Sequence, residues 1–128
     1  MKKIIQTPHA PAPVGPYNQA VQVGKLLFVS GQIALDPSNG KLVTDNLEAE
    51  THQVMKNIGA ILTEAGIGYE NVVKCSVFVS DMNNYGRINE VYAEYFNEAT
   101  APARELVEVA NLPKFVHIEI SAIAELPG

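Results

Sequence analysis

Several residue types are scarce in this sequence, and each scarcity excludes a class of protein. The chain has one cysteine, Cys75, which excludes an intrachain disulfide. It has 9 basic residues against 14 acidic ones, a net charge of −5 that opposes binding to nucleic acid or to an anionic membrane surface. No apolar run approaches the roughly 20 residues of a membrane span, and no apolar core of a secretion signal follows Met1. We therefore expect a cytoplasmic protein without nucleic-acid or membrane partners.

The residues that are present indicate one folded domain. Of the 128 residues, 47% are hydrophobic and 18% are charged, a balance typical of globular proteins. By size scaling, a folded chain of this length buries roughly two thirds of the surface that its extended form exposes. Residues 1–128 are therefore expected to form a single domain with one hydrophobic core.

The first part of the chain predicts an extended arm and a hairpin. Residues 10–16 contain three prolines and a glycine, which exclude a helix. Residues 18–23 and 26–30 are two runs rich in strand-forming residues. The pair Gly24-Lys25 between them suits a type II′ turn, so a β-hairpin is expected here.

The rest of the chain predicts two helices and three strands. Asp45 followed by Glu48 resembles a capping box, and helical spacing of apolar residues continues up to Gly66. A strand is expected over 72–79. A second helix is expected to begin within 81–84, with an apolar stripe that reaches Phe96. Two more strands are expected over 104–110 and 116–124. This order predicts an α+β fold, a mixed sheet with two helices on one face.

Most residues with reactive side chains have a plain structural interpretation. Cys75 alternates with valines in a predicted strand, where a free cysteine behaves as a small hydrophobic residue. The histidines lack metal-ligand spacing, and Glu48 with His52 four residues on reads as a solvated contact. Arg87 falls on the polar side of the second helix and is expected to be solvated. Neither a metal nor a cofactor is predicted.

Two positions leave a structural and a functional interpretation open. Arg104 enters a predicted strand directly after a proline-bounded loop. It could form an ion pair with Glu108 or Glu119, or it could clamp the carboxylate of a ligand. Gly31 follows Ser30 at a strand end, where it is either a plain turn glycine or a point of close approach for a ligand.

A series of segments along nearly the whole chain carries a resemblance to a known family. The segments include Gly15-Pro16-Tyr17, Ser30-Gly31-Gln32-Ile33, the strand 72–79 leading into Asp81-Met82, Asn89-Glu90-Val91-Tyr92, Pro102-Ala103-Arg104 and Glu119-Ile120. Together they resemble the reactive-intermediate deaminases, the RidA or YjgF family. The resemblance implies a chorismate-mutase-like fold that assembles as a homotrimer with clefts between subunits. It also implies hydrolysis of 2-aminoacrylate, 2-iminobutanoate and 2-iminopropanoate to 2-oxo acids and ammonia without a cofactor.

The resemblance also implies roles for individual residues. Arg104 matches the arginine that binds the substrate carboxylate. Further matches to cleft-lining positions are Tyr17, Ser30, Gly31 and Asn89. Helix spacing adds Tyr85 as an apolar wall of the same cleft.

Two positions depart from the family pattern. Ser121 stands where these deaminases generally carry a glutamate that holds the attacking water, and Leu106 stands where they often carry a cysteine. A serine hydroxyl can position water but cannot act as a base near neutral pH without an activating partner. We expect Ser121 and main-chain groups to hold the water, and Leu106 to make the pocket more apolar. Glu119 lies one pleat period, about 6.6 Å, from Ser121, and is expected to be too far away to replace it.

Three functions are weighed on this basis. The first is the hydrolytic deamination of enamines and imines. The second is a protein of the same fold that binds a small 2-oxo acid or amino acid without converting it. The third, a ribonuclease or translation inhibitor, is a label that the family has carried, and the acidic balance of the chain disfavours it.

Overall fold

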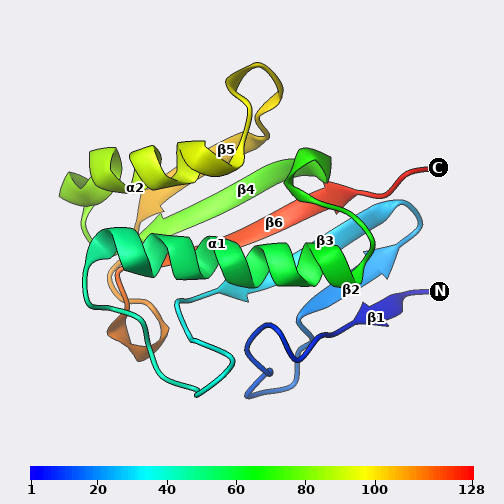
Figure 1. Ribbon diagram of the computed structural model, residues 1–128, viewed down its shortest axis with the longest axis horizontal. Helices are drawn as coiled ribbons and strands as arrows, with labels where there is room; N and C mark the ends of the chain where they lie inside the picture. The colour runs from blue at the N-terminus through cyan, green and yellow to red at the C-terminus, as the bar shows by residue number, and fades with distance from the viewer.

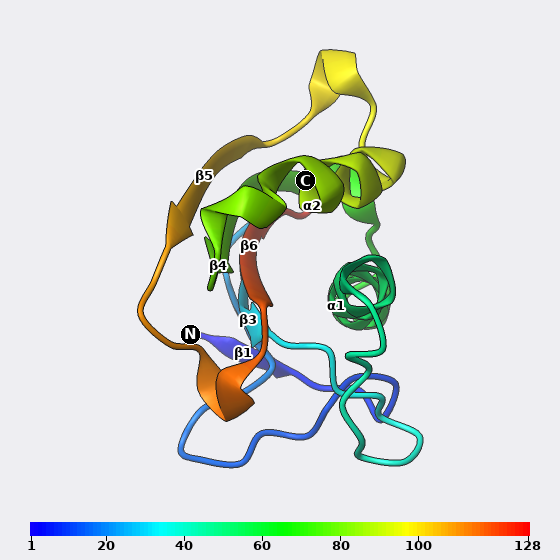
Figure 2. The same cartoon turned by 90° about the vertical axis from the view of Figure 1, so that its left-hand side faces the viewer.

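A six-stranded mixed sheet carries two helices on one of its faces (Figures 1 and 2). The computed structural model describes all residues, 1–128. The strands lie in the order β1-β2-β3-β6-β4-β5, and only β5 runs parallel to its neighbour, β4. Their bounds are β1 Lys3–Ile5, β2 Ala20–Val23, β3 Leu26–Gln32, β4 Val72–Val79, β5 Ala103–Glu108 and β6 Ile118–Glu125; the helices are α1 Leu47–Glu64 and α2 Tyr85–Tyr92. Neither helix combines the length and apolar character needed to cross a membrane. The predicted α+β architecture is confirmed.

The core lies between α1 and the central strands. Val77 of β4 and Ile120 of β6 are fully buried, and they pack against an α1 stripe that includes Ile58 and Leu62. Burying each such side chain stabilises the fold by roughly 1.5–3 kcal/mol. The alternation predicted for 72–79 is confirmed from Cys75 to Val79, whereas Val73 is exposed, because the ladder with β6 is irregular between Val72 and Lys74. Cys75 lies in this core, where burial raises the pKa of its thiol.

The predicted hairpin is confirmed, with one strand added beside it. Gly24 and Lys25 join β2 to β3, and Gly24 has a φ of +59°, which its missing side chain permits. β3 continues to Gln32, two residues beyond the predicted end. The short β1, paired with β2, was not predicted, because three residues are too few to show a periodicity.

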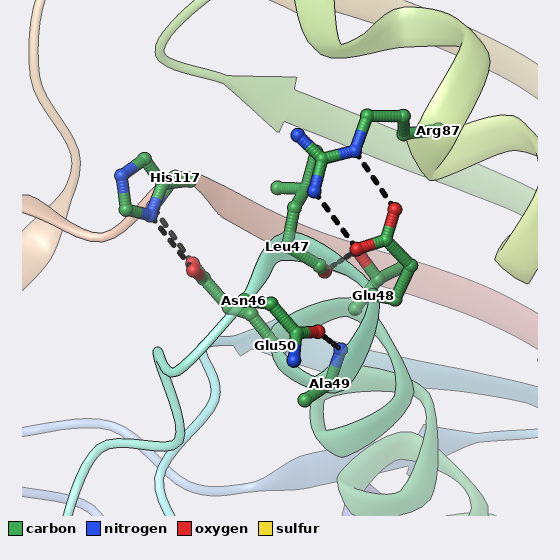
Figure 3. A network of polar contacts seen from close by, with 8 residues as sticks. Asn46, Leu47, Glu48, Ala49, Glu50, Arg87 and His117 are labelled. Carbon is green, nitrogen blue, oxygen red and sulfur yellow. Dashed lines mark hydrogen bonds and ion pairs between the residues drawn. The ribbon is translucent and has the colours of Figure 1, made fainter.

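The first helix begins differently from the prediction. The capping residue is Asn46, whose side-chain oxygen accepts a hydrogen bond from the Ala49 N–H at 2.7 Å (Figure 3). Asp45 is exposed and lies outside the cap, so the predicted capping box is wrong by one residue. Adjacent aspartate and asparagine are both good caps, and the sequence alone does not distinguish them.

Glu48 is used for tertiary contact instead. Arg87 of α2 donates two hydrogen bonds to its carboxylate, each 2.8 Å long (Figure 3), and this lowers the pKa of Glu48 to about 2. Arg87 is exposed, as expected from its place on the polar side of the helix, but its ion pair with Glu48 was not predicted. The expected contact between Glu48 and His52 is wrong, because the His52 ring bonds the hydroxyl of Tyr95 at 2.7 Å.

The elements after β4 are shorter than predicted. A 3-10 turn over Met82–Asn84 precedes α2, and a second over Ala93–Tyr95 follows it, so the predicted stripe is divided among three pieces. β5 ends at Glu108, before the predicted end at 110. β6 starts two residues late, because Lys114 and Phe115, each with a φ of 55°, turn the chain just before it.

A buried carboxylate fastens α1 to the start of β6. Glu50 has no exposed surface, and its two oxygens meet the backbone N–H of His117 at 2.7 Å and the His117 Nδ1 at 2.8 Å (Figure 3). The carboxylate thus satisfies two groups at once. This contact holds the segment that leads into β6.

Glu50→Ala should lower the free energy of unfolding by about 2–4 kcal/mol, because it removes two hydrogen bonds to a buried charged group and leaves a cavity. Urea denaturation measures the change. Glu48→Ala is the matched control, since it removes an exposed carboxylate of the same helix and should have a much smaller effect. Equal destabilisation by the two variants would contradict this role for Glu50.

Candidate functional site

Arg104 is the centre of one polar cluster. It pairs with Cys75 across the parallel β4–β5 ladder, so its side chain lies on the helix-bearing face and meets α2. Nη1 donates to the Asn89 side-chain oxygen at 2.9 Å, and Nη2 donates to the Tyr85 hydroxyl at 3.1 Å. The carbon of the guanidinium lies 4.9 Å from the centre of the Tyr92 ring. Tyr85, Asn89 and Tyr92 follow helical spacing, which explains why they share this face of α2.

The charge of Arg104 has no carboxylate partner. None of the ion pairs in the structure involves it, so the alternative of an ion pair with Glu108 or Glu119 is wrong. Glu108 instead accepts a hydrogen bond from the Met82 N–H at 2.7 Å. A guanidinium has five N–H donors, and two are used by Asn89 and Tyr85, which leaves three for a ligand.

The surroundings of Arg104 are partly apolar. A cavity of about 570 Å³ adjoins it, lined by Asn89, Tyr92, Ala93, Phe96, Glu98, Ala101, Pro102 and Arg104. Tyr85, expected as an apolar wall, contacts the arginine through its hydroxyl and is 42% exposed. Leu106, two residues along β5 on the same face, packs against the hydrophobic core.

A second cluster lies on the other side of the sheet. A pocket of about 120 Å³ is bordered by the proline-rich arm, β3 and β6, and its lining includes Tyr17, Gly31 and Glu119. Glu119 is half-buried, and desolvation by burial raises the pKa of its carboxyl. A Cβ atom added at Gly31 would lie 2.6 Å from Glu119 Oε2. Gly31 therefore allows a close approach, and the approaching group in this chain is the Glu119 carboxylate.

Of the remaining predicted residues, Ser30 and Tyr17 lie near this second cluster and Ser121 lies outside its pocket. The Ser30 hydroxyl donates to the carbonyl of Asn18 at 2.6 Å and so holds the arm against β3. Tyr17 is half-exposed at the pocket. Ser121 lies opposite Ser76 in the β4–β6 ladder, outside the pocket lining that contains Glu119. No group of three or more His, Cys, Asp or Glu side chains is arranged to hold a metal ion.

Glu119 is the residue that the sequence reasoning missed. Glu119 lies one pleat period from Ser121 along β6, whereas the structure brings it against Gly31 of the neighbouring strand. A glycine inside a strand is a sign of a close approach, and an acidic residue on the next strand is a natural candidate for the approaching group. Both residues are visible in the sequence, but the sequence does not show that they lie side by side on neighbouring strands.

The two clusters are too far apart to share a small ligand within one chain. β3 and β5 are separated by β6 and β4, which corresponds to about 14 Å at the usual strand spacing. The two clusters also face opposite ways, because Arg104 lies on the helix side, whereas Glu119 alternates with the buried Ile118 and Ile120 and points to the uncovered side. A site that contains both needs two copies of the chain.

The fold is that of the Rid-type α+β proteins. It superposes on Escherichia coli TdcF with bound serine at a TM-score of 0.91 and 40% identity, covering 98% of this chain and 99% of that one. A family model described as endoribonuclease L-PSP matches residues 7–126. The chain belongs to this family, which also confirms the resemblance to the RidA or YjgF proteins.

Two relatives illustrate the range of the family. The chain is 56% identical over 126 residues to a RutC family protein of Synechocystis sp., covering 98% of this chain and 97% of that protein. It is 48% identical over 124 residues to the 2-iminobutanoate/2-iminopropanoate deaminase of Mus musculus, covering 97% of this chain and 91% of that protein. The family therefore includes hydrolytic deaminases that align with this chain along nearly its whole length.

Proposed function

We propose that this protein hydrolyses the reactive imines 2-iminobutanoate and 2-iminopropanoate, together with the enamine 2-aminoacrylate, to 2-oxo acids and ammonia. The observation that carries the proposal is Arg104, whose guanidinium is oriented by neutral partners and keeps three N–H donors free. A planar fork of this kind suits the one feature that all these substrates share, a planar carboxylate. Kinship with proteins named 2-iminobutanoate/2-iminopropanoate deaminase supports the two imine substrates.

The first step is binding of the carboxylate. Two N–H groups of Arg104 donate to its two oxygens, which fixes the plane of the substrate and the direction of C2. Asn89 and Tyr85 hold the guanidinium at its other donors, so the arginine is preorganised before the substrate arrives. The apolar walls near Arg104 exclude water and strengthen the contact.

The second step is addition of water to C2, and Glu119 is the base in this proposal. The Glu119 carboxylate takes a proton as the water oxygen bonds to C2 of the iminium group. That proton passes to the nitrogen, the C–N bond breaks with its electron pair leaving on ammonia, and the remaining hydroxyl loses its proton to form the ketone. For 2-aminoacrylate, uptake of a proton at C3 first gives 2-iminopropanoate. Neither a cofactor nor a metal takes part in these steps.

Glu119 replaces Ser121 in the role of holding and activating the water. It is the carboxylate beside Gly31 and Tyr17, and its raised pKa is the property that a general base working near neutral pH needs. Ser121 has no comparable partner, since it faces Ser76. The departure from the family pattern at Ser121 therefore leaves the base in place.

The site requires assembly, and we propose a homotrimer in which each cleft combines Arg104 of one copy with Tyr17, Gly31 and Glu119 of a neighbour. The separation of the two clusters supports this arrangement. So does the sheet face opposite the helices, where Leu26 and Phe28 of β3 and Val107 of β5 are about 40% exposed. Size-exclusion chromatography with light scattering should give about 42 kDa, three times the chain mass of 13.9 kDa. A stable monomer at micromolar concentration would contradict the shared site.

The activity is tested by coupling the purified protein to a threonine dehydratase and following the release of ammonia. We expect release faster than the uncatalysed decay of 2-iminobutanoate. Ammonia release at the uncatalysed rate would refute the proposed enzymatic activity. If such a protein still bound 2-oxobutanoate and lost that binding in Arg104→Ala, the alternative of a carboxylate-binding protein would hold instead.

The pH dependence of the activity follows from the base. Burial raises the pKa of Glu119 above its ordinary value of 4.5, and only the ionised form can accept a proton. The value of kcat/KM should therefore rise with pH through a midpoint above 4.5 and level off toward neutrality. The measurement uses excess dehydratase at each pH. A rate that does not change between pH 4.5 and 7 would contradict Glu119 as the base.

Gly31→Ala should displace the Glu119 carboxylate and leave the fold intact, because the end of a flexible side chain can move away from the new methyl group. We expect kcat to fall about tenfold through lost positioning, with unfolding free energy changed by less than about 1 kcal/mol. Gly86→Ala is the control, since a Cβ there meets nothing within 4 Å. Equal kcat values in the two variants would contradict a requirement for glycine at position 31.

A further inference from the structure

Tyr92 lies beneath the guanidinium of Arg104 and was not predicted to have a role at the site. It is the last residue of α2 and is 6% exposed. Its ring centre is 4.9 Å from the guanidinium carbon, closer than the ring of Tyr85 at 5.7 Å. Sequence periodicity counts Tyr92 only as part of an apolar stripe.

The hydroxyl group of Tyr92 does not explain why a tyrosine lies beneath Arg104. It is buried and makes no hydrogen bond to any nitrogen or oxygen, and the neighbouring polar group is the Cys75 thiol. A buried hydroxyl without a strong partner is unfavourable. Phenylalanine would supply the same ring without this cost, so the hydroxyl gives no reason for a residue at this place, and the contacts of the ring have to be considered.

Two neighbours contact the ring of Tyr92. Phe96 packs against it with the ring centres 4.8 Å apart and the planes inclined by 43°. Arg104 occupies a position over the same ring, while Asn89 and Tyr85 take two of its N–H donors. Two hydrogen bonds fix two nitrogens, and a surface beneath the guanidinium fixes its tilt.

We propose that Tyr92 is a positioning residue for Arg104, acting through the face of its aromatic ring. The inference rests on the proposed function, in which Arg104 holds the substrate carboxylate. The ring attracts the cation and keeps its plane fixed, so the free N–H groups already have a fixed orientation when the carboxylate arrives. Tyr92 does not touch the reacting atoms. Its loss weakens carboxylate binding and leaves the addition of water nearly unchanged.

The test compares Tyr92→Phe, which keeps the ring, with Tyr92→Leu, which removes it. The probe is 2-oxobutanoate, measured by isothermal titration calorimetry, beside KM and kcat for the coupled reaction. A cation–π contact between a half-buried cation and a buried ring corresponds to about tenfold in affinity. Tyr92→Leu should therefore raise the dissociation constant and KM about tenfold with kcat changed less than threefold. Tyr92→Phe should stay within twofold of the unchanged protein.

Two further variants separate positioning from packing. Tyr95→Leu removes a ring that contacts Tyr69 and His52 and has no contact with Arg104, so it should leave affinity within twofold. In an Arg104→Ala background, Tyr92→Leu should cause no further fall in the residual kcat/KM, because the cation is gone. A tenfold loss that persists in this background, or normal affinity in Tyr92→Leu, would overturn the proposal.

A spectroscopic readout covers the case in which Tyr92→Leu fails to fold. The Arg104 guanidinium protons, assigned by comparison with Arg104→Lys, should show an upfield ring-current shift in the unchanged protein and in Tyr92→Phe. Unshifted resonances would overturn the proposal. Failure of the proposed function would look different from failure of this proposal. In that case the protein without any substitution would neither bind 2-oxobutanoate nor accelerate ammonia release.

Discussion

Replacing Arg104 by alanine should lower kcat/KM for 2-iminobutanoate by about 10²- to 10⁴-fold, because two hydrogen bonds to a charged group, each about 1.5–3 kcal/mol, are lost. Arg104→Lys keeps the charge but should still lose about 10- to 10²-fold. A lysine ammonium is a point charge and cannot hold both carboxylate oxygens in one plane. It also cannot reproduce the contacts to Asn89 and Tyr85 at the same time. Steady-state kinetics with the coupled dehydratase measure both variants.

The second arginine provides the matched control. Arg87 lies on α2 within a few residues of Tyr85 and Asn89, but its guanidinium is paired with Glu48. Arg87→Lys should leave kcat and KM within about twofold. Kinetics of Arg104→Lys that match those of Arg87→Lys would show that the fork geometry of Arg104 is unimportant.

Glu119→Gln is expected to have an effect of similar size on a different parameter. The change keeps the shape of the side chain and removes its ability to accept a proton, which corresponds to about 10²- to 10⁴-fold in kcat. The dissociation constant of 2-oxobutanoate should change less than threefold, because Arg104 is intact. Measuring kcat beside calorimetric affinity separates the base from the clamp.

Ser121→Ala is the matched control for Glu119→Gln, because both residues lie on the same face of β6. It should leave kcat within about twofold. Ser121→Glu should likewise give no increase in rate if Glu119 already supplies the base. A large loss in Ser121→Ala together with normal kcat in Glu119→Gln would return the water-holding role to Ser121.

The fold was predictable where a repeating pattern was long enough to read. The alternation over 72–79 gave β4 with its correct bounds, and the pair Gly24-Lys25 gave the hairpin turn. Short or ambiguous signals failed. Three residues could not reveal β1, and neighbouring caps at Asp45 and Asn46 left the start of α1 uncertain by one residue.

The candidate site was only partly predictable, because the sequence does not give distances across strands. Arg104 stood out by its position after a proline-bounded loop, and Asn89 by its match to a cleft-lining position of the family. Both meet in the structure. Glu119 was missed because its partner, Gly31, lies about ninety residues away along the chain. Tyr92 was missed because a ring that faces a cation has the same periodicity as a core residue.

Mixing two inactive variants tests the central claim, a deaminase site shared between copies of the chain. Arg104→Ala and Glu119→Gln are each expected to be nearly inactive alone. When they are unfolded together and reassembled in equal amounts, about a quarter of the clefts should combine an intact Arg104 with an intact Glu119, and about a quarter of the normal activity should return. Native mass spectrometry verifies that mixed trimers have formed. No recovered activity in verified mixed trimers would contradict the shared site.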